Sequence, residues 1–395
     1  MRQHAHAQEM GDAVIINTCA VTNEAERQSR QAVRKAKRDF PGSKIIVAGC
    51  SAQLNPKTYG DMPEVDLVLG NHEKMQQESF APSLQEKVRV NDILEVKETA
   101  HHLVSGFENH VRAFIQIQNG CDHRCTFCSI PLGRGNNRSV PMPEIIHQVA
   151  HLMEHGCHEV VLTGVDITGY GGDLPGQPGL GQLCKRILAQ VPDLKRLRLS
   201  SLDPVEVDAD LFRLIAEEPR MMPHFHVSMQ AGDDMVLKRM KRRHLRQDIY
   251  DFCAKVRDLR PGVVFGADVI AGFPTETDEM FQRTYDCIQD NDITYLHVFP
   301  YSARKDTPAA RMPQVAKPLI KERAGRLRDL GTQLRSRYFQ SLIGQELTVV
   351  TELGNKAHGE NFAPIRIESA QEITPGTFCT LKITGATENN LIAHL

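Results

Sequence analysis

The sequence predicts an α/β protein of three parts: an N-terminal α/β domain (1–100), a central partial (β/α) barrel (107–337) and a small all-β, OB-like domain (338–395). Three observations lead to this prediction. A chain of 395 residues is too long for one ordinary core. Apolar runs alternate with helical segments up to about residue 340, which is typical of parallel sheets. Beyond that point β-rich runs follow one another without a helix, which favours a small barrel.

In the first part, short apolar runs followed by turn residues predict buried parallel strands. These runs are Ala13–Ile16, Lys44–Ala48 and Val65–Leu69. A helix begins near Thr22–Asn23, where Asn23 is the candidate cap and Glu26 sits three residues further on, and Pro41-Gly42 ends it. The polar stretch 73–110 is interpreted as the connection to the barrel.

Six strand–helix units over about 230 residues suit a closed or partly open parallel barrel better than a flat sheet. The candidate strands are Ala113–Ile117, Glu159–Leu162, Arg196–Ser200, His224–Ser228, Val264–Ile270 and Tyr295–Pro300, with helices such as Pro143–His155 and Asp278–Asp290 between them. The final part contributes the β-rich runs Gln345–Thr351, Pro364–Ile367 and Thr377–Thr384.

Composition bounds the class of protein. The net charge of −2 gives no global case for nucleic-acid binding. No apolar run is long enough to span a membrane, and the N-terminus has no secretory signal, so the sequence predicts a soluble cytoplasmic protein. In a reducing compartment, clustered cysteines are metal ligands or catalytic groups. Five scattered cysteines are interpreted as ordinary buried residues: Cys157, Cys184, Cys253, Cys287 and Cys379.

Three further cysteines, Cys121, Cys125 and Cys128, form a CxxxCxxC loop directly after a predicted strand. Such a loop brings three thiolates to one cluster, and thiolates are the usual ligands of iron–sulfur clusters. A four-iron cluster held by three cysteines keeps one iron open for substrate chemistry. Two alternatives stay open: a zinc site, which normally needs a second cysteine pair, and inert buried cysteines.

This loop, with Phe127 before its last cysteine, resembles the signature of the radical S-adenosylmethionine (SAM) enzymes. The resemblance implies a 4Fe–4S cluster whose open iron binds SAM, and a 5′-deoxyadenosyl radical that abstracts hydrogen. It also implies that Cys121, Cys125 and Cys128 are the catalytic cluster ligands and that Phe127 contacts the cofactor.

Further motifs resemble the methylthiotransferase family: Asn17-Thr18-Cys19-Ala20-Val21-Thr22, Gly49-Cys50-Ser51-Ala52-Gln53 and the C-terminal β-module. That family has an N-terminal domain with a second cluster, a radical SAM barrel and a C-terminal TRAM domain. The residues after Cys19 are most similar to the branch that acts on N6-threonylcarbamoyladenosine (t6A) at position 37 of tRNA.

The resemblance therefore implies a tRNA methylthiotransferase that uses a 4Fe–4S cluster and SAM. The expected partners are tRNA and a flavodoxin- or ferredoxin-like electron donor, with an unidentified sulfur source, no membrane and a monomeric state. Other branches modify isopentenyladenosine in tRNA or an aspartate of a ribosomal protein. A catalytically degenerate RNA-binding protein is the alternative from another class.

One departure concerns the second cluster, a second 4Fe–4S site that the family holds with three N-terminal cysteines. Only Cys19 and Cys50 have counterparts here, and the first cysteine of the pattern, in a Gly-Cys-x-x-Asn segment, is absent. A shortened start is the favoured explanation, and a natural two-cysteine variant is the alternative.

By resemblance, several residues at predicted strand ends contact SAM. They are Gly164, Asp166, Ser201, Gln230 and Asp268. Four of them have an ordinary structural interpretation as well: Gly164 and Asp166 as a βα turn, Ser201 as part of a helix cap, and Asp268 as a paired polar group in the barrel.

Local basic residues are candidates for RNA contact. Positions 238–246 hold six Lys or Arg, which suits a phosphate backbone or a solvated helix face. The candidates in this run are Lys238, Arg239, Lys241, Arg242 and Arg243. Arg134, Arg138 and Arg304 are predicted to meet substrate phosphate or carboxylate. The C-terminal part has three basic residues against six Glu from residue 338 on, so RNA contact there needs local groups such as Lys356, Phe362 and Arg366.

Overall fold

The computed structural model describes residues 1–8, 10–97, 111–369 and 371–394. The predicted start of the barrel at residue 107 thus lies outside the described residues. Contacts divide the chain into two compact units. The N-terminal unit comprises Met1–Ala100, Asn119–Arg138 and Ser302–Met312, and the barrel unit comprises His101–Gln118, Ser139–Tyr301 and Pro313–Leu395. The cysteine loop belongs to the first of these units.

The N-terminal unit is built on a parallel sheet of strand order β1-β2-β3-β4. Its strands are β1 (Ala13–Thr18), β2 (Lys44–Gly49), β3 (Leu67–Leu69) and β4 (Val88–Arg89). Its helices are α1 (Arg2–Ala7), α2 (Asn23–Asp39), α3 (Cys50–Leu54), α4 (Pro56–Gly60) and α5 (Ile130–Arg134), with 3-10 turns η1 (Glu73–Met75), η2 (Gln77–Phe80), η3 (Ile93–Glu95) and η5 (Pro308–Arg311). Buried aliphatic residues of β2 and β3 form the core on both faces of the sheet.

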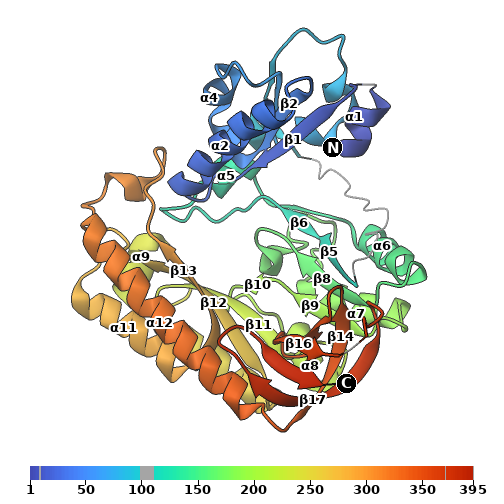
Figure 1. Cartoon of the computed structure of the whole chain (residues 1–395). Helices are drawn as coiled ribbons and strands as arrows, with labels where there is room; N and C mark the ends of the chain where they lie inside the picture. Colours follow the sequence, from blue (N-terminus) through green and yellow to red (C-terminus); the bar gives the residue numbers. More distant parts are fainter. Residues whose placement is uncertain (9, 98–110, 370, 395) are drawn as a thin grey trace. The chain divides into compact units, whose positions relative to one another are not determined.

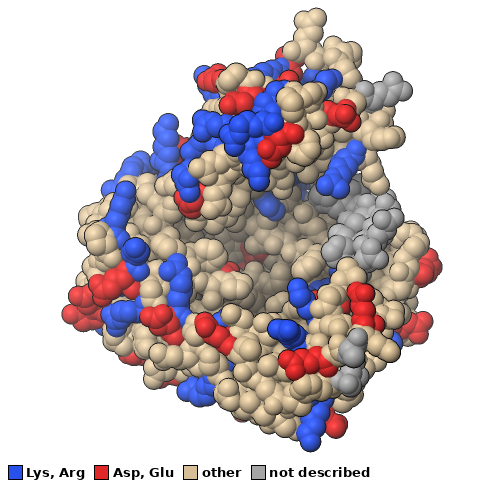
Figure 2. Space-filling view, in the orientation of Figure 1, with Lys and Arg blue, Asp and Glu red and all other residues tan. Residues whose placement is uncertain are grey.

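Two details of this unit correct the sequence expectations. Thr22, not Asn23, caps α2, because its side chain accepts a hydrogen bond from the amide of Ala25. The stretch 73–110 is not merely a connection, because β4 within it pairs with β3. Most of the basic side chains of α2 are exposed to solvent. Figure 2 shows Lys and Arg gathered over this helix.

The central part of the barrel unit has two sheets, β5-β8-β9 and β10-β11-β12-β13, which together hold seven strands among the described residues. All the pairs within these two sheets are parallel. Helices lie on the outer side of these strands, with α11 and α12 along β12 and β13 (Figure 1). The strands are β5 (Arg112–Gln116), β8 (Glu159–Thr163), β9 (Arg196–Leu199), β10 (Ser201–Leu202), β11 (His224–Gln230), β12 (Val264–Ala271) and β13 (Ile293–Pro300). The helices are α6 (Met142–Glu154), η4 (Ile167–Gly169), α7 (Leu180–Gln190), α8 (Ala209–Glu217), α9 (Asp234–Met240), α10 (Arg246–Leu259), α11 (Asp278–Asp290) and α12 (Lys317–Ser341).

Residues alternate between the two faces of these strands, as the two-residue period of a strand requires. In β11, Phe225, Val227 and Met229 join the large hydrophobic core between strands and helices. The intervening residues therefore face the opposite side, which is called the inner face below. The same parity puts Gly266 and Asp268 of β12 on the inner face, since Phe265, Ala267 and Val269 belong to the core.

The C-terminal part is a closed five-stranded barrel of order β14-β15-β16-β18-β17. Its strands are β14 (Glu346–Glu352), β15 (Lys356–Gly359), β16 (Pro364–Glu368), β17 (Phe378–Ala386) and β18 (Leu391–His394). The predicted small all-β domain is confirmed, although the sequence did not indicate β15 and β18. None of the helices in the described ranges is long and apolar enough to cross a lipid bilayer.

Candidate functional site

The cysteine loop lies between two short strands, β6 (Gln118–Asn119) and β7 (Arg138–Ser139). Two glycines with positive φ, Gly120 and Gly135, allow the loop to close. Gly120 has φ +75, and a Cβ atom there would lie 1.8 Å from the carbonyl oxygen of Asn136. The amide of Cys121 donates a hydrogen bond to the carbonyl of Gly135, at 3.1 Å. The two ends of the loop are therefore held together in a tight turn, and all three cysteines lie on this turn.

The three side chains fit the donor set of an iron–sulfur cluster. None of the three is assigned to a disulfide; Cys125 is buried, whereas Cys121 and Cys128 are half-buried. The Sγ of Cys128 accepts a hydrogen bond from the amide of Ile130 at 3.4 Å, and such bonds to a thiolate tune an iron–sulfur ligand. A single loop with three thiolates can hold a 4Fe–4S cluster and leave one iron for another ligand.

Cys19 and Cys50 directly follow two neighbouring strands. Thr18 at the end of β1 pairs with Gly49 at the end of β2, so the two cysteines emerge at the same edge of the sheet. Cys19 is exposed, and its Sγ accepts a hydrogen bond from the amide of Val21 at 3.4 Å. The topology thus gathers the two predicted N-terminal ligands at the carboxyl ends of parallel strands.

The sulfur of Cys50 also receives two side-chain donors that the sequence did not indicate as a set. Arg134 of the cysteine loop donates from Nε to Cys50 Sγ at 3.3 Å. Asn71 approaches the same sulfur through Nδ2 at 3.5 Å and bonds the carbonyl of Gly133 at 2.6 Å. Within the N-terminal unit, the loop that carries Cys121, Cys125 and Cys128 is therefore tied to Cys50.

The other two predicted substrate arginines have partners inside the N-terminal unit. Arg138 is buried and donates to the backbone carbonyls of Val96 and Arg134. Arg304 bonds the side chains of Asn23 and Glu26 at the beginning of α2. The substrate contacts predicted for Arg134, Arg138 and Arg304 stay predictions.

In the barrel unit, Gly164 and Asp166 follow β8 in a turn that is held by Gln118. The Oε1 atom of this fully buried glutamine accepts the amides of Val165 and Asp166, each at 2.9 Å. A Cβ atom on Gly164 would lie 2.8 Å from the same oxygen. Position 164 therefore requires a glycine because Gln118 lies so close to its backbone.

Three other predicted cofactor contacts belong to adjacent strands of the barrel. Ser201 pairs with His226 of β11, and Gln230 ends β11 with φ +64. Asp268 lies on the inner face of β12 and contacts two histidine side chains. The cofactor contacts predicted for Gly164, Asp166, Ser201, Gln230, Asp268 and Phe127 stay predictions.

Asp268 accepts hydrogen bonds from two histidines, a cluster that sequence reasoning missed. Its Oδ1 lies 3.0 Å from Nε2 of His226 and 3.2 Å from Nδ1 of His297. Burial alone would raise the pKa of the Asp268 carboxyl, but the two imidazoles outweigh it and hold the pKa below the usual range. The hydrogen bond to Asp268 raises the pKa of His297, despite an opposing effect of burial.

The basic run does not form one continuous patch. Arg242 pairs with Asp203 at 2.7 Å, and Arg243 pairs with Glu206. Arg239 donates to the carbonyl of Thr275. Lys238 and Lys241 are exposed, on and just beyond the end of α9. Phosphate contact by these five residues stays a prediction.

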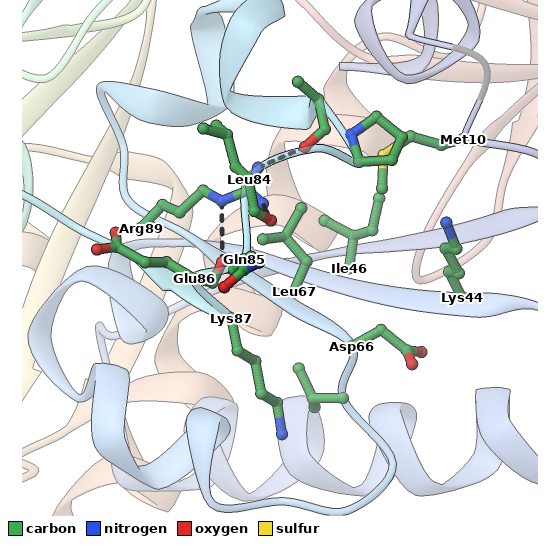
Figure 3. Close-up of a pocket in the computed structure, with 13 residues that line it drawn as sticks. Met10, Lys44, Ile46, Asp66, Leu67, Leu84, Gln85, Glu86, Lys87 and Arg89 are labelled. Atoms are coloured by element: carbon green, nitrogen blue, oxygen red, sulfur yellow. Dashed lines mark hydrogen bonds between the residues drawn. The ribbon is translucent and has the colours of Figure 1, made fainter.

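A pocket of about 320 Å³ lies on the N-terminal sheet, and Figure 3 shows Ile46 and Leu67 at its apolar wall with Met10. Arg89 at its rim donates to the carbonyls of Ala81 and Leu84. None of the predicted site residues lines this pocket, so it is not part of the candidate site.

Comparison with known proteins adds independent findings. The model of the radical SAM superfamily matches residues 115–288, and that of the uncharacterized protein family UPF0004 matches residues 2–70. The fold is similar to that of TsrM, a radical SAM methyltransferase of Kitasatospora setae, with a TM-score of 0.56 at 15% identity over 78% of this chain and 66% of that one.

Curated relatives cover most of the chain. The threonylcarbamoyladenosine tRNA methylthiotransferase MtaB of Rickettsia prowazekii (strain Madrid E) is 55% identical over 93% of this chain and 87% of that protein. The enzyme of the same name from Bacillus subtilis (strain 168) is 35% identical over 87% and 77%. A tRNA-2-methylthio-N(6)-dimethylallyladenosine synthase of Corynebacterium urealyticum is 31% identical over 97% and 75%. Radical SAM enzymes use a 4Fe–4S cluster and SAM, which the loop of Cys121, Cys125 and Cys128 suits. The chain belongs to the radical SAM methylthiotransferase family, in the MtaB-like branch.

Proposed function

We propose that the protein is a tRNA methylthiotransferase that adds a methylthio group to C2 of N6-threonylcarbamoyladenosine at position 37. The observation that carries the proposal is the 55% identity with the Rickettsia threonylcarbamoyladenosine tRNA methylthiotransferase across 93% of the chain. Relatives named as tRNA-2-methylthio-N(6)-dimethylallyladenosine synthases are 31–32% identical to the chain, as distant as the threonylcarbamoyladenosine enzyme of Chlamydia pneumoniae at 31% and more distant than the Rickettsia enzyme.

The residues of the cysteine loop have defined roles in this proposal. Cys121, Cys125 and Cys128 hold the cluster, and the hydrogen bond from the amide of Ile130 to Cys128 keeps that thiolate in place. When bound, the cluster and SAM supply an electron and a hydrogen-abstracting radical. Gly120 allows the backbone of the loop to close against the carbonyl of Asn136.

In the N-terminal unit, Cys19 and Cys50 are proposed as ligands of a second 4Fe–4S cluster. Both follow paired residues of β1 and β2, so one ligand group can reach both sulfurs. Arg134 and Asn71 donate hydrogen bonds to the Cys50 sulfur and hold its position. The arginine therefore acts on the ligand of one site from the loop that carries the other.

Partners and location complete the proposal. The substrate is tRNA, the electron donor is a flavodoxin- or ferredoxin-like protein, and the enzyme works as a cytoplasmic monomer. The C-terminal barrel corresponds to the TRAM domain of the family. Lys356 and Arg366 are exposed there. Phe362 is a poor candidate for RNA contact, because its ring stacks on His224 at a centroid distance of 4.9 Å.

The test is mass spectrometry of tRNA nucleosides from a host that lacks this activity, with and without the chain. Appearance of 2-methylthio-t6A is the expected result. Cys125→Ala is expected to lose both the product and reductive SAM cleavage, whereas Cys50→Ala loses the product and keeps SAM cleavage. Cys379→Ala, at a half-buried position of the C-terminal barrel, is the matched control and keeps both. A methylthio group on isopentenyladenosine alone, or on no tRNA nucleoside, would contradict the assignment.

A further inference from the structure

The inner face of the barrel unit carries a histidine–aspartate–histidine cluster that is assembled from three neighbouring strands. Its members are His226 of β11, Asp268 of β12 and His297 of β13. Asp268 and His297 stand directly opposite each other in the register of β12 and β13. The rings of His226 and His297 are 4.8 Å apart, with the carboxylate bridging both.

The glycine opposite His226 makes room for this arrangement. Gly266 pairs with His226 across β11 and β12, and a Cβ atom at position 266 would lie 2.6 Å from Nδ1 of His226. The imidazole therefore lies against bare backbone. Its Nε2 is directed at Asp268, and only 12% of the His226 side chain is exposed. Asp268 and His226 together form a fixed support.

His297 is the open end of the cluster. Its side chain is 61% exposed, and its Nδ1 is committed to Asp268. The Nε2 atom of the same ring is on the far side of that hydrogen bond. An imidazole that donates from Nδ1 to a carboxylate is stabilised as the cation, so its Nε2–H can donate to an anion. The cluster thus presents a supported, exposed N–H donor rather than a buried, self-contained pair.

Other cations of these strands are already committed. Arg112, Arg196 and Arg198 all pair with Glu159, and the last two also donate to backbone carbonyls of the C-terminal barrel. Among the inner-face side chains that the structure describes, His297 therefore has a donor to offer to a ligand.

The chemistry of the proposed substrate supplies a matching group. The threonylcarbamoyl substituent ends in a free carboxylate, whereas an isopentenyl substituent carries no charge. Chemistry in parallel barrels takes place at the C-terminal ends of the strands, to which the inner face leads. A metal ion is the other class of ligand for two histidines and a carboxylate. The geometry favours hydrogen bonding, because both imidazole nitrogens that face Asp268 lie at donor distance from the same oxygen.

We propose that His297, positioned by Asp268 and His226, binds the carboxylate of the threonylcarbamoyl group and thereby selects t6A over adenosines with an uncharged N6 substituent. This inference rests on the proposed function. Asp268 is then a positioning residue on the substrate side rather than a contact of SAM.

The test uses the reconstituted holoenzyme with SAM and three anticodon stem-loop RNAs. One carries t6A, the second carries its threonine methyl ester, and the third carries isopentenyladenosine. The wild type is expected to bind the t6A RNA about 10- to 100-fold more tightly than the ester, the range for one hydrogen bond between charged groups. His297→Gln should remove that preference by weakening the acid and not the ester. Asp268→Asn should reduce the preference in the same direction.

Formation of 5′-deoxyadenosine without RNA is the second measurement, and it is expected to stay within about twofold of wild type in both variants. His151→Gln is the control, since His151 is a partly exposed histidine on α6. Equal wild-type affinity for acid and ester, or equal weakening of both by His297→Gln, would overturn the inference. So would loss of SAM cleavage in Asp268→Asn, or a stoichiometric zinc ion that His297→Gln removes. Product formation on t6A RNA tests the proposed function separately, because the affinity comparison does not require turnover.

Discussion

Two layers of side chains on the inner face of the barrel differ in how their polar groups are paired and how far they are exposed. At the amino ends of β5, β8 and β9, Glu159 is fully buried and paired with Arg112, Arg196 and Arg198. Burial would raise the pKa of the Glu159 carboxyl, but the three guanidinium groups outweigh it and lower the pKa to about 2. In the neighbouring strands β11, β12 and β13, the cluster of His226, Asp268 and His297 leaves the His297 side chain more than half exposed.

The amino-end layer is closed by the C-terminal barrel. Arg196 donates to the carbonyl of Thr348 at 2.9 Å, and Arg198 donates to those of Gly359 and Glu360 at 2.8 Å. Phe362 adds its ring between His224 and Arg198. The three arginines of this layer are hydrogen-bonded to Glu159 or to backbone carbonyls within the fold, whereas the histidine layer keeps the Nε2 donor of His297 for a ligand. The difference separates a structural end of the barrel from a binding end.

The largest effect is expected from breaking the structural layer. Glu159→Gln leaves three guanidinium groups beside a neutral amide, and removing one member of a buried ion network costs about 3–5 kcal/mol. The free energy of unfolding in urea should fall by that amount at neutral pH. Glu352→Gln is the matched control with a smaller loss, because Glu352 is 25% exposed and lies 3.3 Å from Arg112 alone among these arginines. A loss below about 1 kcal/mol for Glu159→Gln would show that the network is not structural.

The same layer predicts a pH dependence of stability. The folded pKa of Glu159, about 2, lies below the ordinary glutamate value of 4.5. A depressed carboxyl pKa stabilises the fold fully above the unfolded value, and this contribution is lost as pH falls toward the folded value. The stability gap between wild type and Glu159→Gln should stay constant from pH 7 to 5. Below pH 4.5 it should narrow by about 1.4 kcal/mol per unit. A gap that narrows already between pH 7 and 5 would point to another group.

A smaller effect is expected at the glycine that supports the histidine layer. Gly266→Ala places a methyl group 2.6 Å from Nδ1 of His226, so the imidazole must shift. Such overpacking costs about 1–3 kcal/mol of unfolding free energy. RNA affinity should fall with it. Gly325→Ala is the control, because a Cβ atom at this position of α12 meets no atom within 4 Å, and the change should be neutral or slightly stabilising. Unchanged stability and affinity in Gly266→Ala would contradict the close approach.

These layers also mark what the sequence could predict. Periodicity and turn residues placed α11 at Asp278–Asp290 and six of the seven described barrel strands within one or two residues of their observed bounds. The short strand β10 was not predicted. The spacing of Cys121, Cys125 and Cys128 predicted a cluster loop, and the structure shows these residues on one tight turn. The pairing of His226, Asp268 and His297 depends on register across three strands, which no local pattern encodes. For the same reason the sequence could not foresee that Arg134 reaches Cys50, or that Phe362 packs against the barrel.

The smallest effect is expected from a polar group that the fold leaves unsatisfied. The buried Oγ of Ser200, directly after β9, has no hydrogen-bond partner among the described residues. Ser200→Ala should therefore change the unfolding free energy by less than about 0.5 kcal/mol, because no intramolecular bond is lost. Thr351→Val is the contrast, since that buried hydroxyl donates to the carbonyl of Thr374 at 2.7 Å and accepts the amide of Thr377, and it should cost about 1–3 kcal/mol. If Ser200→Ala cost as much as Thr351→Val in urea unfolding, the hydroxyl would have a structural partner and would belong with the amino-end layer. If Ser200→Ala left the unfolding free energy unchanged yet weakened RNA or SAM binding, the Ser200 hydroxyl would be a ligand donor, as is proposed for His297.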